Sequence, residues 1–98
     1  MDTRQIEELG KRAAAAVVGD GVFPQVRVES DEDDDFRPIY RFSFLIDRQH
    51  SSMRPGLIRI RLIQKLRDEL VSRRDDHLPV IRILNQADWD QEARARSH

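Results

Sequence analysis

The sequence predicts an α+β fold, a two-layer sandwich in which helices cover one face of a three-stranded mixed sheet. Two kinds of segment predict it. Some segments place apolar residues at helical spacing, and others alternate apolar and polar residues as strands do. The predicted order is helix, strand, strand, helix, strand, with a short C-terminal helix. A hairpin followed by a right-handed β-α-β crossover then gives antiparallel and parallel pairs in one sheet.

Length and composition indicate one small domain over residues 1–98. Hydrophobic residues make up 39% of the chain and charged residues 36%, and the net charge of −1 indicates no particular partner. No apolar run approaches the roughly 18 residues of a membrane span, and the N-terminus is too polar for a secretory signal. The chain has no cysteine. We therefore expect a cytoplasmic protein without membrane association, ordered over about residues 3–90, with a flexible tail at 91–98.

The first helix is predicted at residues 3–18, where apolar residues recur at helical spacing. Thr3 is the expected N-cap, because a threonine oxygen accepts a hydrogen bond from a first-turn amide. The Gly-Asp-Gly segment at 19–21 is expected to end the helix and form a turn.

Two strands are predicted next, at 22–29 and 37–47, joined by a flexible acidic hairpin loop at 30–35. Pro24 cannot donate to a strand ladder, so we expect it at the strand start or on a sheet edge. The predicted core-facing residues are Val26, Val28, Tyr40, Phe42, Phe44 and Ile46, with Arg41, Ser43 and Leu45 on the other face.

The segment GLIRIRLIQKLRDEL, at 56–70, fits two interpretations. Its first half, 57–62, alternates like a strand, but the whole segment forms one apolar helical stripe. Because the alternation stops at residue 62 and the residues are good helix formers, we expect one helix from about 55 to 73. The stripe comprises Ile58, Leu62, Ile63, Leu66 and Leu70. Both long helices should cover the same face of the sheet.

The last predicted strand spans 79–84, and a short helix should follow it. Asn85 stands at the expected N-cap and Asp88 three residues later, which is a pattern typical of helix starts. Trp89 is the apolar residue behind this cap.

The element order and four segments resemble the BolA-like proteins, whose fold is similar to type II KH modules. The segments are RIRLI at 59–63, DEL at 68–70, HLPVIRIL at 77–84 and NQADW at 85–89. The resemblance covers half of the chain and implies a partner-binding domain that shares an iron–sulfur centre with a glutaredoxin. Ile60 stands where the family has a histidine, and the acidic loop lacks the second one, so the cluster role does not carry over.

The predicted helix at 55–73 carries the strongest candidate binding residues. Arg54, Arg61 and Lys65 share one side near its N-terminus, where first-turn amides lack helical partners, and Arg48 extends this basic patch. Arginine and tryptophan often anchor interfaces, which adds Trp89 to the expected partner-binding set.

Other constellations are weaker. Asp31, Asp33 and Asp35 are candidate cation ligands, but they lack the spacing of an EF-hand, and we expect a solvated loop without a tight metal site. The histidines, which are His50, His77 and His98, have no metal-ligand spacing. His50 is followed by two serines but lacks an orienting third group, and His77 stands at a capping or surface position.

We therefore expect a non-enzymatic module that binds a protein partner without a cofactor, as a monomer or weak dimer. The alternative is a KH-like nucleic-acid-binding domain, whose affinity would fall steeply with salt. A metal-dependent or other small enzyme is a lesser alternative.

Overall fold

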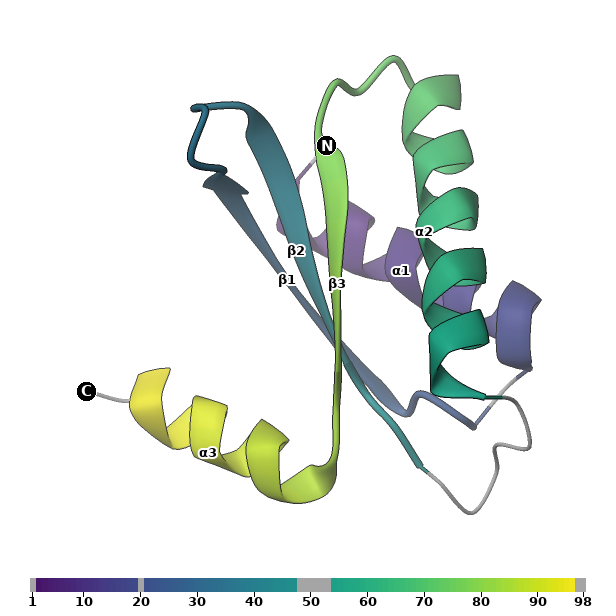
Figure 1. Cartoon of the computed structure of the whole chain (residues 1–98), viewed down its shortest axis with the longest axis vertical. Coiled ribbons are helices and arrows are strands. Elements are labelled where there is room, and N and C mark those ends of the chain that lie inside the picture. Colours follow the sequence, from purple (N-terminus) through teal and green to yellow (C-terminus); the bar gives the residue numbers. More distant parts are fainter. Residues whose placement is uncertain (1, 20, 48–53, 97–98) are drawn as a thin grey trace.

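The computed structural model describes residues 2–19, 21–47 and 54–96 (Figure 1). The elements are α1 (Thr3–Val18), β1 (Gln25–Glu32), β2 (Pro38–Leu45), α2 (Pro55–Ser72), β3 (Leu78–Leu84) and α3 (Gln86–Arg96). The sheet has the order β1-β2-β3, with β1 antiparallel and β3 parallel to the central β2. The predicted α+β fold and its three-stranded mixed sheet are confirmed.

Helix α1 is capped by Asp2 rather than by Thr3, which is the first helical residue. The Asp2 Oδ1 accepts a hydrogen bond from the Gln5 amide at 2.8 Å, and the Gln5 side chain accepts one from the Asp2 amide at 2.9 Å. This reciprocal arrangement satisfies two amides at the helix start. At the other end, Gly19 adopts a positive φ of 85° and its N–H donates to the Ala15 carbonyl, as the glycine there predicted.

The segment with two interpretations is one helix, α2, and the helical prediction is confirmed. One side of α2 is fully buried, since Ile58, Leu62 and Leu66 have no exposed surface. Helix α1 approaches the sheet closely beside it, because a Cβ atom on Gly10 would lie 3.1 Å from a ring carbon of Phe42. Both helices cover the same face of the sheet, as expected (Figure 1).

The sheet also has a covered end on its other face, which the sequence did not predict. Leu45 and Leu84 are paired in register there, and the indole of Trp89 from α3 packs on them. Leu45 is therefore buried, although the alternation placed it on the outward side with Arg41. Asn85 caps α3 by accepting a hydrogen bond from the Asp88 amide at 2.8 Å, as predicted, and the helix continues to Arg96.

The acidic hairpin loop is shorter than the predicted 30–35, because β1 runs to Glu32, which pairs with Pro38. The turn is closed by a hydrogen bond from the Asp33 amide to the Arg37 carbonyl at 3.0 Å. Phe36 completes it with a positive φ of 63°. The strand extends this far because the residues at 30–32 face β2 partners, and strand pairing outweighs the low β propensity of acidic residues.

Candidate functional site

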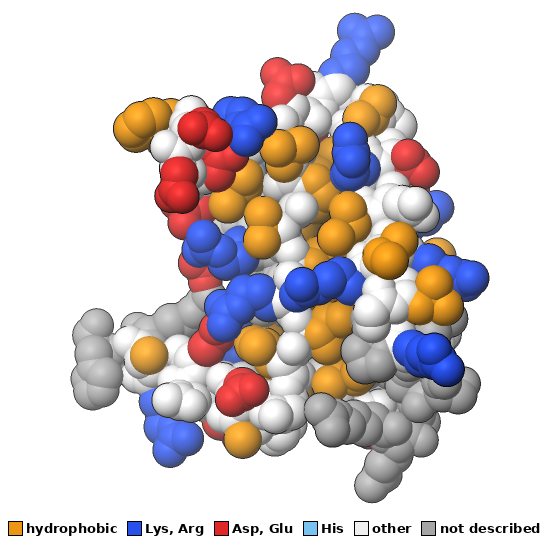
Figure 2. Space-filling model, viewed as in Figure 1, with side chains coloured by type: hydrophobic (Ala, Val, Ile, Leu, Met, Phe, Trp, Pro, Cys, Tyr) orange, Lys and Arg blue, Asp and Glu red, His pale blue; other side chains and the backbone are white. Residues whose placement is uncertain are grey.

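Helix α2 carries a second apolar stripe on the side away from the core. Leu57, Ile60 and Val71 are 41%, 56% and 73% exposed, respectively. With Gln64 and Arg67 they occupy consecutive positions along the outer face, at the three- and four-residue spacing that lines one side of a helix. Figure 2 shows hydrophobic and basic side chains mixed on the face of the molecule that includes β3 and α2. The sequence patterns predicted the buried stripe and the basic side of this helix, but not its outer apolar stripe.

Two of the predicted cations flank this outer stripe. Arg54 is the residue before the first turn of α2 and Arg61 lies one to two turns further on, and both are exposed. Neither pairs with an acidic side chain within the described part of the chain, and the first turn of α2 contains no acidic residue. The helix therefore presents unneutralised positive charge beside exposed apolar side chains.

Lys65 lies differently from the two arginines. Its ammonium is 3.6 Å from a carboxylate oxygen of Glu69, and both side chains line a hollow of about 170 Å³ between α1 and α2. Lys65 therefore borders the contact between the two helices rather than the outer stripe. Arg48, which extended the predicted basic patch, lies outside the described residues, as do His50 and His98.

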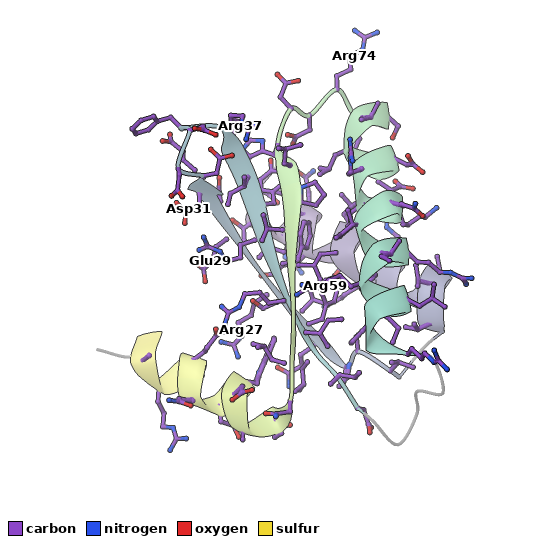
Figure 3. All side chains as sticks on the ribbon, in the orientation of Figure 1. Arg27, Glu29, Asp31, Arg37, Arg59 and Arg74 are labelled. Carbon is purple, nitrogen blue, oxygen red and sulfur yellow. The ribbon has the colours of Figure 1, made fainter. Side chains whose placement is uncertain are left out.

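Trp89 is separated from the α2 face by the sheet. Its indole is buried on the opposite face, and the Arg27 guanidinium lies 3.6 Å above the ring centroid. The same guanidinium donates to the Trp89 carbonyl at 2.9 Å, as Figure 3 shows for Arg27 reaching α3. Trp89 thus attaches α3 to the sheet, and the structure does not bring it together with the predicted basic residues.

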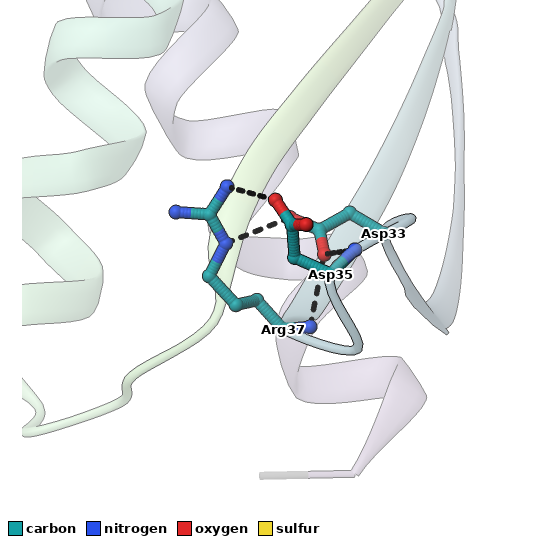
Figure 4. Close-up of polar contacts among 3 residues, drawn as sticks. All are labelled: Asp33, Asp35 and Arg37. Atoms are coloured by element: carbon teal, nitrogen blue, oxygen red, sulfur yellow. Dashed lines mark hydrogen bonds and ion pairs between the residues drawn. The ribbon is translucent and has the colours of Figure 1, made fainter.

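The three candidate cation ligands are engaged by arginines. Asp31 pairs with Arg41 at 3.0 Å. Asp33 accepts hydrogen bonds from the amides of Asp35 and Arg37, and the Arg37 guanidinium contacts both aspartates (Figure 4). The hydrogen bond from the Arg37 amide is the main cause that holds the pKa of Asp33 below its ordinary value. Within the described residues, no three acidic or histidine side chains are placed to hold a metal ion.

A cluster of Tyr40, Asp75 and His77 was not predicted. The Tyr40 hydroxyl donates to Asp75 Oδ2 at 2.7 Å, and Asp75 Oδ1 lies 2.6 Å from Nδ1 of His77 and accepts from its amide at 2.9 Å. The cluster borders a hollow of about 360 Å³ that Arg73 and Arg74 also line. An aspartate that holds one imidazole nitrogen is known from catalytic sites, but no nucleophile lies in the described lining of this hollow.

The tip of the β1–β2 hairpin carries the most exposed large hydrophobic side chain of the described residues. Phe36 is 81% exposed and stands beside the acidic residues of the turn, where Figure 2 shows red side chains gathered. Positive φ is uncommon in residues other than glycine and asparagine, and it is rarer still in bulky residues. No sequence pattern predicts this conformation, because turns of this kind usually have glycine or asparagine at such a position.

Comparisons with known proteins add no family assignment. A scan of the sequence against models of protein families finds no match, and a search of curated proteins finds none either. The resemblance to BolA-like proteins is thus supported in its element order and mixed sheet alone. No helix within the described residues combines the length and hydropathy needed to cross a membrane.

Proposed function

We propose that this chain is a non-enzymatic protein-binding module that docks its partner on the outer face of α2. The observation that carries the proposal is the second apolar stripe of that helix, bordered by Arg54 and Arg61. Single exposed apolar residues are normal on protein surfaces, but these are aligned along one helix. A helix face of this kind fits a partner's groove or helix, with the apolar residues as anchors.

The charge of the face defines the partner's chemistry. Arg54 and Arg61 are exposed, and Arg67 lies on the stripe itself, whereas Asp68 is the one nearby acidic residue of the outer face. A partner with apolar side chains and a carboxylate placed opposite Arg61 would therefore complement it, because opposite charges at an interface rim favour association and orientation.

Strand addition to the sheet is a less suitable docking mode. The Arg59 guanidinium reaches from α2 to the free edge of β3 and donates to the Ile81 carbonyl at 2.8 Å (Figure 3). Pro79 lies on the same strand and has no amide hydrogen to offer. A charged side chain and a proline are features that protect strand edges against pairing with another chain.

Site-specific photo-crosslinking in the source cells tests the proposal. A photoreactive side chain at Gln64, at the centre of the stripe, should give a discrete crosslinked protein, and the same group at Gln91 on α3 should not. Ile60→Asp should abolish the Gln64 product, whereas Arg4→Asp on α1 should leave it unchanged. Equal products from both positions, or a product insensitive to Ile60→Asp, would contradict the proposal.

Nucleic acid is the competing ligand, since exposed arginines also bind phosphate groups. Fluorescence anisotropy with labelled RNA and DNA decides between them. Binding that weakens with salt at a steep logarithmic slope, and that is lost in an Arg54→Ala, Arg61→Ala variant but not in Ile60→Asp, would replace the protein partner by a nucleic acid.

A further inference from the structure

We infer that the α2 face binds a second copy of this chain, with the two α2 helices antiparallel about a two-fold axis near Gln64. The inference rests on the proposed function and names its partner. Two-fold dimers are the commonest homo-oligomers, and they require a surface that is complementary to itself. The outer face of α2 meets that requirement in its apolar spacing and in its charges.

The apolar spacing is that of a helix seam. The outer stripe consists of Leu57, Ile60, Gln64, Arg67 and Val71. Its successive spacings of three and four residues are those of the two core positions in a heptad repeat, which keep one side of a helix facing a partner helix. The stripe runs nearly the whole length of α2, whose other side is fixed against the sheet and α1.

The charges select the antiparallel orientation. Arg61 and Asp68 are both exposed, lie two turns apart on the same flank of the stripe, and have no ion-pair partner within the described residues. A two-fold axis midway between them places each Arg61 opposite the partner's Asp68, which gives two ion pairs. A parallel two-fold arrangement would put this flank of the two copies on opposite edges of the seam, so Arg61 could not reach the partner's Asp68 and neither ion pair would form.

The same axis also aligns the apolar residues. The midpoint between Ile60 and Val71 lies within one residue of the midpoint between Arg61 and Asp68. One two-fold axis can therefore bring both pairs into contact. One residue corresponds to about 1.5 Å along a helix, which side chains accommodate. Each Ile60 then packs on the partner's Val71, and these two exposed side chains lose their contact with water.

The central residues of the stripe limit the affinity. Gln64 and Arg67 are polar, and polar residues at seam positions specify register and orientation at a cost in stability. The aliphatic part of Arg67 can cover the partner's apolar side chains while its guanidinium stays in water. The dimer is therefore weak, largely dissociated at about 10 µM and associated at about 1 mM.

Sedimentation equilibrium of the whole chain over this concentration range tests the inference. The wild type should shift from monomer to dimer and no further. Arg61→Asp and Asp68→Arg should each weaken the dimer about tenfold or more, and the double variant should restore it, because the exchanged charges again face each other. Arg4→Asp, on the exposed side of α1, is the matched control and should leave the association unchanged. Circular dichroism should show the same helix content in all variants.

Three results separate the inference from the proposed function. A wild type that stays monomeric at about 1 mM overturns self-association. If the crosslink at Gln64 then still captures a different protein in a manner that depends on Ile60, the protein-binding function stands without it. A dimer that the double charge exchange does not restore overturns the antiparallel α2 arrangement, because its two ion pairs are then absent.

Discussion

The imidazole ring of His77 stacks on the phenol ring of Tyr40, with centroids 3.9 Å apart and planes within 5° of parallel. Both residues also hydrogen-bond to Asp75, in the loop that follows α2. The carboxylate therefore joins the start of β2 to the loop that leads into β3. We therefore expect this cluster to contribute to the stability of the fold.

Removal of the Tyr40 hydroxyl should destabilise the protein. Tyr40→Phe keeps the stacked ring but deprives the mostly buried Asp75 carboxylate of one donor, and the loss should lower the free energy of unfolding by about 1–3 kcal/mol. Urea denaturation at neutral pH measures it. Asp76→Asn, at the exposed neighbouring carboxylate, is the control and should change stability by less than about 0.5 kcal/mol. An unchanged free energy of unfolding in Tyr40→Phe would contradict the structural role of the hydrogen bond.

The stability should also depend on pH through Asp75. Burial raises the pKa of this carboxyl, but hydrogen bonds from the His77 amide, the Tyr40 hydroxyl and the His77 ring outweigh burial, so the pKa lies below its ordinary value. The contribution is complete above the unfolded pKa of about 3.9 and is lost as pH falls through the lower folded pKa. Urea titrations between neutral and acidic pH should show a smaller acid loss in Asp75→Asn than in the wild type. Equal losses of stability in the variant and the wild type would show that other groups cause the acid sensitivity.

Tyr40 provides a spectroscopic test at alkaline pH, because it is the one tyrosine of the chain. Burial, followed by the hydrogen bond and the negative charge of Asp75, raises the pKa of Tyr40 to about 12. Tyrosinate absorbance should therefore appear about two units above the ordinary pKa near 10. The unfolded chain releases this proton earlier, so stability should fall as pH rises from about 10 towards 12. A midpoint near 10 in the folded protein would contradict the buried, hydrogen-bonded hydroxyl.

Phe36→Gly should stabilise the protein by about 1 kcal/mol. The left-handed backbone at Phe36 destabilises any residue other than glycine by roughly this amount. Because the ring of Phe36 is exposed, its removal breaks few packing contacts. Thermal unfolding monitored by circular dichroism measures the change. Glu32→Gly, four residues earlier and within strand β1, should destabilise instead, because glycine weakens a strand. A destabilising Phe36→Gly would show that the ring contacts the protein more than the structure indicates.

Leu66→Ala should cost about 2–5 kcal/mol of unfolding free energy, because the side chain is fully buried between the sheet and α1. Ile60→Ala, on the outer side of the same helix, is the matched control and should cost less than about 1 kcal/mol. Chemical denaturation of both variants gives the difference. Similar losses of unfolding free energy at the two positions would show that Ile60 is buried. They would contradict the exposed outer stripe of α2.

The features predicted correctly from the sequence depend on neighbouring residues. The buried stripe of α2 runs from Ile58 to Leu70, over about three turns, so its helical period outweighed a strand pattern that was six residues long. The Asn85 cap and the Gly19 helix end are likewise local signals. The choice of Thr3 over Asp2 as the cap was wrong because both residue types cap helices, and the glutamine that completes the box stands three residues after Asp2.

The candidate sites depend on contacts that no local pattern contains. Tyr40 and Asp75 are 35 residues apart, and Arg27 and Trp89 are 62 apart, so neither contact has a local signal. The alternation of the strand placed Leu45 on the outward face of the sheet. No local pattern could show that Trp89, near the end of the chain, covers it there. The outer stripe of α2 could have been found from its spacing, but it became significant only when the buried stripe was located on the opposite side of the helix.

The attachment of α3 indicates the order in which the protein opens. Among its described residues only Trp89 is buried, and its apolar contacts are with Leu45 and Leu84, apart from the main core under α1 and α2. Release of α3 would separate the indole from these two leucines and from Arg27 and would break the ion pair between Arg82 and Glu92, while the main core stays covered. We therefore expect α3 to open as a separate cooperative unit, so that its amides exchange with solvent through a partial opening, while the buried amides of β2 and α2 exchange only when the whole domain unfolds.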